Sequence, residues 1–332
     1  MGKNELAQVL DVVYRAILRE TVSFNYYYRA SNDPSLPDGV RGLLGKLAEE
    51  ERGHRKILLK EYTAIQKGWS GRGQHSSEEG SISYSIPEDP EFLSLPAPVQ
   101  LDVEAVSLPS RLVGGDHILG RVAESGEGSG GGLFLILYDA MGHGIETTRF
   151  NSAAASILGE YLDATSSADA ETEILSPSRA VTRLNADFSG QFQGSGVFLT
   201  LVAVYIDPVG GVLKYSIAGH EPPLIIRSDG TMESLYYTQL LIGIDQERRY
   251  MEYSVPFTQG DRLCVFSDGI LEARNSAGEF YGRHRLNRVL AGCSERSAKE
   301  IVNRILADLR EFCGDETLED EVSVAVVGCC GT

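Results

Sequence analysis

The chain has 332 residues, of which 42% are hydrophobic and 23% are charged, and its formal net charge of −17 disfavours binding to nucleic-acid phosphates. This length is too great for one small core and predicts two domains, one of them large. No apolar run reaches the about 18 residues of a membrane-spanning helix, and the N-terminus lacks a secretory signal pattern, so we expect a soluble cytoplasmic protein.

Residues 4–67 have the pattern of two helices joined by a turn. Apolar side chains recur every three or four residues, and two prolines and a glycine interrupt the run at residues 31–39. Glu20 on the first helix, and Glu51 and His54 on the second, break into the apolar stripe that we expect to face inward. A buried carboxylate needs a partner, and antiparallel folding about the turn places Glu20 level with Glu51, so we expect these three side chains to lie together.

Residues 69–97 are rich in Gly, Ser, Glu and Pro and show no period, which is typical of a linker. Beyond them, apolar or alternating runs predict strands over residues 133–139, 198–207, 213–218, 224–227, 251–257, 262–267 and 321–328. Helical periodicity predicts helices over residues 147–162, 177–192 and 298–312. Because several strands follow one another directly, we expect an α+β fold with packed antiparallel sheets.

Four aspartates occur where a predicted strand meets a turn. Asp139 ends an apolar strand before a Gly-rich turn, and Asp268 stands between another strand and a glycine. Asp116 follows two glycines, and Asp320 comes just before the last strand. An aspartate beside a glycine is most often only a turn residue when it stands alone. Together the four predict a Mg²⁺ or Mn²⁺ site, because oxygen ligands suit these ions and a two-metal centre activates water against a phosphate ester.

Seven short segments, in this order, resemble the SpoIIE-type, or RsbU-type, branch of the PPM metal-dependent serine/threonine phosphatases. They are residues 109–116 (PSRLVGGD), 139–144 (DAMGHG), 184–185 (LN), 218–223 (AGHEPP), 260–262 (GDR), 267–273 (SDGILEA) and 320–323 (DEVS). The resemblance covers residues 96–332 and implies an αββα sandwich. It also implies hydrolysis of phosphoserine or phosphothreonine by in-line attack of water, without a covalent phosphoenzyme.

The resemblance implies a ligand for each metal ion. Asp139 would bridge two Mn²⁺ or Mg²⁺ ions, with the backbone carbonyl of Ala140 also on metal. Asp268 and Asp320 would hold one ion, and Asp116 would hold the other side directly or through water. The implied substrate is a phosphorylated STAS-domain anti-anti-sigma protein in a bacterial partner-switching pathway.

Two histidines lie within the same segments. His143 and His220 both stand in Gly-containing turns, where a hydrogen-bonded structural role is more common than acid catalysis. We therefore leave both out of the expected catalytic set.

The N-terminal hairpin resembles half of a ferritin-like, or rubrerythrin-like, di-iron domain, in which a Glu on one helix faces a Glu-x-x-His on the next. A full site needs four helices, so the resemblance implies a homodimer whose four-helix bundle holds two irons between Glu20, Glu51 and His54 of each copy. The competing interpretation is that Glu51 and His54 pair with each other or face solvent on a charged helix, and that the hairpin is a metal-free dimerisation module.

The sequence thus predicts a ferritin-like sensor hairpin over residues 1–68, a linker over residues 69–97 and a PPM-type phosphatase domain over residues 98–332. The main hypothesis is a protein serine/threonine phosphatase regulated by the state of an N-terminal di-iron site. The alternative is an iron-binding oxidase or storage protein whose C-terminal domain is a regulator. The complete set of four aspartates favours the phosphatase.

Overall fold

The computed structural model describes residues 12, 13, 16, 17, 20, 23, 24, 27, 30, 31, 36–69, 86, 90–108, 115–123, 131–141, 145–164, 176–192, 197–318 and 320–330. The predicted hairpin residues 4–11, most of the linker and the glycine-rich turn that contains His143 lie outside the described residues.

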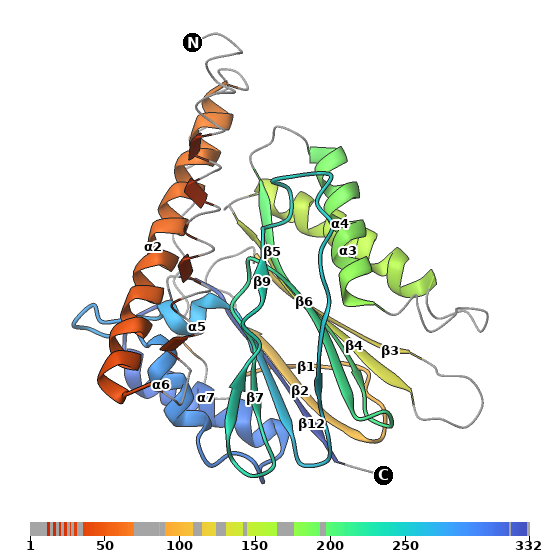
Figure 1. Cartoon of the computed structure of the whole chain (residues 1–332), viewed down its shortest axis with the longest axis vertical. Coiled ribbons are helices and arrows are strands. Elements are labelled where there is room, and N and C mark those ends of the chain that lie inside the picture. The colour runs from red at the N-terminus through yellow and green to blue at the C-terminus, as the bar shows by residue number, and fades with distance from the viewer. Residues whose placement is uncertain are drawn as a thin grey trace.

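The described N-terminal residues are mostly helical. The positions described between residues 12 and 31 are helical, and a second helix, α2 (Asp38–Trp69), has 32 residues. Leu36 and Pro37 lie outside helix, which confirms the predicted break, because proline has no N–H and restricts the residue before it. Figure 1 shows α2 as a long helix along one side of the rest of the molecule.

Two sheets form the centre of the fold. Sheet 1 has the strand order β1 (Phe92–Leu93), β2 (Leu101–Leu108), β12 (Val322–Cys329), β11 (Arg262–Phe266), β7 (Leu224–Ile226) and β8 (Met232–Ser234). Sheet 2 has the order β10 (Tyr253–Pro256), β6 (Val212–Ala218), β5 (Phe198–Asp207), β4 (Gly132–Met141) and β3 (Asp116–Ala123), and β9 (Thr238–Gln239) pairs with β6. All these named pairs are antiparallel except β6 with β9. The predicted packed antiparallel sheets are therefore confirmed.

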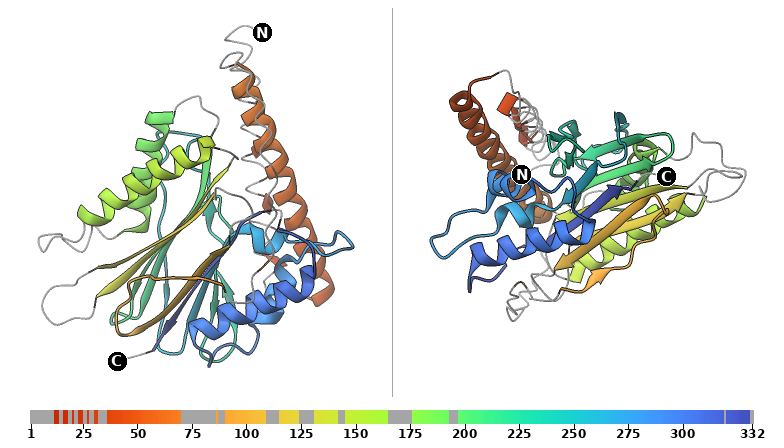
Figure 2. Two further views of the ribbon diagram at one scale, coloured as in Figure 1. Left: turned by 180° about the vertical axis from the view of Figure 1, so that it is seen from behind. Right: turned by 90° about the horizontal axis from the view of Figure 1, so that it is seen from below.

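Helices cover the outer faces of the two sheets. α3 (Ile145–Ala164) and α4 (Pro177–Phe192) pack on sheet 2, whereas α5 (Asp268–Glu272), α6 (Gly282–Leu290) and α7 (Ala298–Cys313) pack on sheet 1. Figure 2 shows the same layers from behind and from below. The result is the αββα sandwich that the family resemblance implies.

The strand β4 shows why a sandwich strand has a continuous apolar sequence. Leu133, Leu135 and Leu137 pack between the two sheets, and Phe134 and Ile136 alternate with them toward α3 and α4. Both faces are buried, so period-2 alternation of apolar and polar residues is lost. The strand β3, by contrast, lies at the edge of sheet 2, and its mixture of apolar and charged residues did not predict a strand.

The described helices do not combine the length and the apolar character that crossing a lipid bilayer requires.

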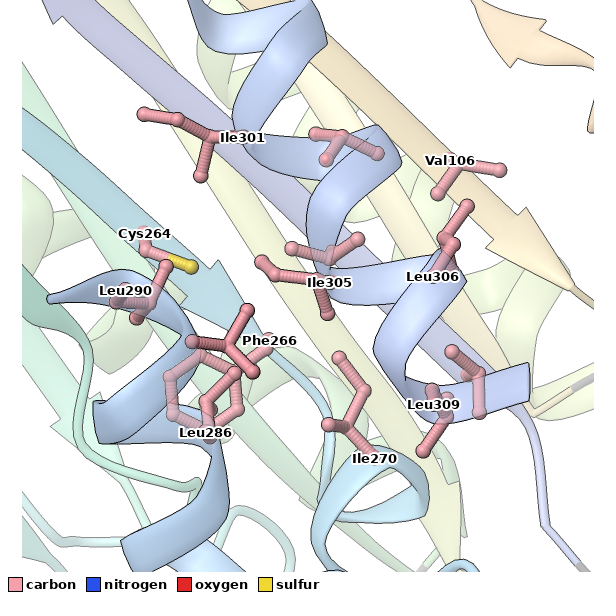
Figure 3. Packing of buried hydrophobic residues seen from close by; sticks show 14 of the residues in the cluster. Val106, Cys264, Phe266, Ile270, Leu286, Leu290, Ile301, Ile305, Leu306 and Leu309 are labelled. Atoms are coloured by element: carbon pink, nitrogen blue, oxygen red, sulfur yellow. The ribbon is translucent and has the colours of Figure 1, made fainter. Parts of the chain in front are cut away.

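The outer core on sheet 1 is built around α7. Ile305 is fully buried and lies among side chains of α5, α6 and β11, as Figure 3 shows. We predict that Ile305→Ala lowers the free energy of unfolding by about 2–5 kcal/mol, because it removes buried methyl groups and leaves a cavity. Urea denaturation measures the effect. Asn303→Ala, on the exposed face of the same helix, should stay within about 0.5 kcal/mol of the parent, and an equal loss in both variants would contradict the prediction.

Candidate metal centre

Two of the predicted metal ligands lie opposite each other on neighbouring strands of sheet 2. Asp116 begins β3 and Asp139 lies near the end of β4, and the two are direct partners in the antiparallel register. The backbone N–H of Ala140 donates to the carbonyl of Gly115 at 3.3 Å. A side chain at Gly115 would collide with the carboxylate of Asp139, so the glycine before Asp116 allows this close approach.

The other two predicted ligands come from sheet 1. Asp268 begins α5 directly after β11, and Asp320 lies just before β12, which is the antiparallel neighbour of β11. The hydroxyl of Ser267 donates to the carbonyl of Glu321 at 3.1 Å and accepts from the N–H of Ser323 at 3.0 Å. This serine therefore fixes the turn that carries Asp268 to the segment that carries Asp320.

Glu321 connects the two halves of the centre. Its two carboxylate oxygens accept the backbone N–H groups of Gly115 and Asp116 at 2.6 and 2.7 Å. Such charge-assisted hydrogen bonds are about twice as strong as neutral ones. The contact joins the start of β3 in sheet 2 to the start of β12 in sheet 1, and it thus brings the two pairs of aspartates to one place.

Burial and the charges of neighbouring carboxylates raise the pKa of three of the four aspartates. Burial, and then the charge of Asp139, raises the pKa of Asp116 well above its usual value. Burial, followed by the charges of Asp268 and Asp320, does the same to Asp139. Burial and the charge of Asp268 raise the pKa of Asp320 to about 6. A group of carboxylates with this property favours a bound cation, which would restore the ionised form of each.

The donor atoms fit hard divalent cations. Within the described part of the chain, the Oδ2 atom of Asp116 is buried without a hydrogen-bond partner. Carboxylate oxygens of Asp268, Glu272 and Asp320 lie within 4.8 Å of one another. Oxygen donors at this density suit Mg²⁺ or Mn²⁺. Glu272 was not predicted from the sequence, although it lies in the same turn of helix as Asp268.

A basic face of α2 lies against this centre. Arg52, Arg55 and Lys56 line a small cavity of about 40 Å³ together with Asp139 and Asp268. The ammonium of Lys56 pairs with Glu272 and lies 3.9 Å from an oxygen of Asp268 and 3.9 Å from an oxygen of Asp320. The sequence pattern suggested solvent-facing charges on this helix, but Arg52 and Arg55 are each only 8% exposed.

Buried ion pairs hold that face in place. Glu221 accepts from Arg52 at 3.2 Å and from Arg283 of α6 at 3.4 Å, and Arg55 donates to the carbonyl of Gly219 at 3.4 Å. Burial opposes ionisation of Glu221, but the charges of Arg52, Arg283 and Arg55 outweigh it and lower its pKa to about 2. Glu221 is therefore ionised at neutral pH and anchors α2 to the sandwich.

Other motif residues support the backbone around the centre. His220 is buried, its Nδ1 lies 2.9 Å from the hydroxyl of Thr200, and burial lowers its pKa to about 4, so it is neutral at physiological pH. Asn185 is fully buried, donates to the carbonyl of Asp245 at 2.8 Å and accepts from the N–H of Gly243 at 3.1 Å. These hydrogen bonds fit the structural role expected of His220.

The hairpin residues converge as predicted. The Nδ1 of His54 lies 3.3 Å from Glu51 and 3.5 Å from Glu20, and ligand atoms of all three lie within 4.8 Å of one another. A hydrogen bond from Glu51 raises the pKa of Glu20, and a hydrogen bond to Glu51 raises the pKa of His54. The imidazole of His54 is 60% exposed, whereas both carboxylates are 19% exposed.

Two residues of the apolar stripe that we expect to face inward, Ile17 and Phe24, also contact the sandwich. Ile17 is fully buried against Phe198 and Leu241 of the sandwich. Phe24 is 3% exposed and packs near Ala48 and Tyr236. Ile17 and Phe24 thus also contact the sandwich, although Phe24 packs on Ala48 of α2 as an inward-facing residue should. The four-helix bundle stays a prediction.

The Glu221 anchor gives a test with a defined pH dependence. We predict that Glu221→Gln lowers the free energy of unfolding at pH 7 by about 3–5 kcal/mol, because two arginines lose a buried counter-charge. The pKa of Glu221 is depressed in the folded state, so its stabilising contribution is present above about pH 4.5 and is lost as the pH falls toward 2. Urea denaturation should show a smaller difference at pH 3 than at pH 7. The exposed control Glu50→Gln should show neither effect, and a pH-independent difference for Glu221→Gln would contradict the ion-pair account.

Known proteins resemble this chain in sequence and in fold. The chain is 26% identical over 297 residues to phosphoserine phosphatase RsbU of Bacillus subtilis, which covers 89% of this chain and 81% of that protein. It is 27% identical over 252 residues to protein IcfG of Synechocystis, which covers 71% of this chain and 39% of that protein.

Two solved structures show the same PP2C-like α+β fold at low sequence identity. The SiaA-PP2C domain of Pseudomonas aeruginosa has a TM-score of 0.57 at 17% identity and covers 68% of this chain and 84% of its own. The PP2C phosphatase domain with a fragment of the regulatory domain of SpoIIE from Bacillus subtilis has a TM-score of 0.55 at 18% identity and covers 98% of this chain and 97% of its own.

A family model described as stage II sporulation protein E (SpoIIE) matches residues 129–329, which is more than half of the chain. The chain therefore belongs to the SpoIIE family and is a metal-dependent protein serine/threonine phosphatase of the PP2C type.

Proposed function

We propose that the centre formed by Asp116, Asp139, Asp268 and Asp320 holds two Mn²⁺ or Mg²⁺ ions and hydrolyses phosphoserine or phosphothreonine in a protein. The observation that carries this proposal is that four carboxylates from separate segments meet at one edge of the sandwich, where burial and neighbouring charges raise the pKa of Asp116, Asp139 and Asp320. Two divalent ions bound there would lower the pKa of a water molecule and stabilise the charge that develops during in-line phosphoryl transfer.

The residues of the chain have distinct parts in this proposal. Asp139 lies between the Asp116 side and the Asp268 side and is suited to bridge two ions, with the carbonyl of Ala140 beside it. Asp268 and Asp320 hold one ion, and Asp116 holds the other directly or through water. Glu321 and Ser267 keep these groups in position through backbone hydrogen bonds. No side chain needs to act as a covalent nucleophile.

We infer that the substrate is a phosphorylated STAS-domain protein of a partner-switching pathway. The support is the similarity to phosphoserine phosphatase RsbU, together with 25% identity over 141 residues to phosphoserine phosphatase RsbP, both of Bacillus subtilis. The negative net charge of the chain excludes a simple electrostatic preference for acidic substrates, so recognition must rest on local contacts near the centre.

Asp139 provides the direct test of the phosphatase. We predict that Asp139→Asn reduces Mn²⁺-dependent hydrolysis of a phosphoserine STAS-domain protein at least about 100-fold, because the carboxylate shared by both metal positions is lost. Release of phosphate is measured over a Mn²⁺ titration. Asp163→Asn, on the exposed side of α3, should keep the parent rate. Full activity in Asp139→Asn, or activity in the parent that persists in EDTA, would exclude the proposed centre.

We further propose that residues 1–68 form a dimerising sensor, that residues 69–97 link it to the phosphatase of residues 98–332, and that two copies of Glu20, Glu51 and His54 hold di-iron. The support is the convergence of the three side chains, and the exposed imidazole of His54 leaves one side of the cluster open to a second copy. Iron, oxygen or peroxide would then be the regulatory signal. There are two alternatives: the protein is an iron oxidase or storage protein, or the hairpin is a metal-free dimerisation module.

Iron content separates these alternatives. We predict about one iron per protomer in anaerobically purified protein, carried by a dimer, and loss of that iron in Glu51→Ala/His54→Ala. Metal analysis and solution mass are the measurements, and Glu50→Ala on the exposed face of α2 is the matched control. Protein that binds no iron even after anaerobic Fe²⁺ loading would leave the hairpin as a structural element. Equal phosphatase activity in iron-loaded, iron-free, oxidised and reduced protein would exclude the regulatory role.

A further inference from the structure

Among the described residues on the basic face of α2, Lys56 is the one whose side-chain nitrogen lies within 4 Å of candidate metal ligands. Its ammonium pairs with Glu272 and lies 3.9 Å from both Asp268 and Asp320. These three carboxylates are the same ones whose oxygens lie within 4.8 Å of one another. The ammonium of Lys56 thus lies at the carboxylate cluster where the proposed function places a divalent ion.

A lysine and a divalent ion cannot use this cluster independently. Both reduce the mutual repulsion of the same carboxylates, and Lys56 holds Glu272 by a hydrogen bond and lies within ion-pair distance of Asp268 and Asp320. An ion coordinated there would also repel the ammonium across a few ångströms of partly buried space, where charge interactions exceed those in bulk water. Occupancy by one cation must therefore weaken occupancy by the other.

The surrounding contacts hold Lys56 in this position. Arg52 lies one helical turn before Lys56, and Arg55 is its immediate neighbour in the sequence. Both arginines are buried against the segment around Glu221. Figure 1 shows α2 beside α5, the helix that carries Asp268 and Glu272. The ammonium of Lys56 is therefore held near the carboxylates by a helix that is itself fixed to the sandwich.

We propose that Lys56 is an intramolecular competitor for the divalent ion held by Asp268 and Asp320, so that docking of α2 is an inhibitory contact. The inference rests on the proposed metal centre and adds a regulatory step to it. Because coupling between two binding events is reciprocal, release of α2 raises metal affinity, and metal binding weakens the docking of α2 by the same factor. Any signal that moves α2 then acts on the catalytic metal directly.

The first test measures metal binding without substrate. Isothermal titration of Mn²⁺ into the full-length chain should show that Lys56→Met binds the weaker of the two ions about tenfold more tightly than the parent. Lys56→Arg keeps the positive charge and should stay within about threefold of the parent affinity. Lys46→Met, on the exposed face of α2, should match the parent. Equal or weaker Mn²⁺ binding in Lys56→Met would overturn the inference.

The second test follows the helix itself by hydrogen exchange over residues 45–60. Saturating Mn²⁺ should speed exchange there in the parent, whereas in Lys56→Met exchange should be faster already without Mn²⁺ and should change little when it is added. Protection that is unchanged by Mn²⁺ in the parent would overturn the competition. A Lys56→Met variant with unchanged Mn²⁺ affinity and a raised KM would also overturn it, because the lysine would then bind the substrate phosphate. Failure of every variant and the parent to bind Mn²⁺ would instead exclude the metal centre on which the inference rests.

Discussion

The repulsion between carboxylates at one edge of the sandwich is the constraint on which the rest of the structure depends. Asp116 and Asp139 are buried neighbours, and Asp268 and Asp320 approach them from the other sheet. Ionised groups in such a place are costly unless cations or hydrogen bonds compensate them. The fold keeps them together through backbone contacts that do not depend on the aspartates, chiefly the two hydrogen bonds of Glu321. These hydrogen bonds hold the aspartates together and so favour the binding of cations between them.

The long helix α2 supplies positive charge to this edge. The chain as a whole is strongly acidic, yet Arg52, Arg55 and Lys56 line the same cavity as the acidic residues Asp139, Glu221, Asp268 and Glu272. Glu221 pairs with Arg52 of α2 and with Arg283 of α6, whereas Lys56 faces the candidate metal ligands. Docking of α2 and the electrostatic energy of the catalytic centre are therefore coupled. A change in one must alter the free energy of the other.

Much of the catalytic part could be predicted from the sequence, because its signals are local. An apolar strand that ends in Asp and Gly marks Asp139 and Asp268, and the strands and helices of the core follow simple periods. The bridging role of Glu321 and the burial of Arg52 could not be predicted in this way. Arg52 meets Glu221 at a separation of 169 residues, and in a helix rich in Glu and Arg its charge suggests a solvated surface. Only the packing of α2 on the sandwich decides whether Arg52 is buried beside Glu221 or exposed to solvent.

The apolar pattern of the N-terminal hairpin also predicts burial without predicting the partner. Its apolar stripe correctly predicted a buried face, and the spacing of Glu20, Glu51 and His54 correctly predicted their convergence. A periodic stripe does not identify what covers it, however: Ile17 packs on Phe198 and Leu241 of the sandwich, and Phe24 packs on Ala48 of α2 and near Tyr236. A four-helix bundle that buried these two side chains against a second copy would have to remove them from Phe198, Leu241 and Tyr236. Such a bundle and the docked helix would exclude each other, so any dimerisation through this stripe would also withdraw the positive charge that α2 places at the metal ligands.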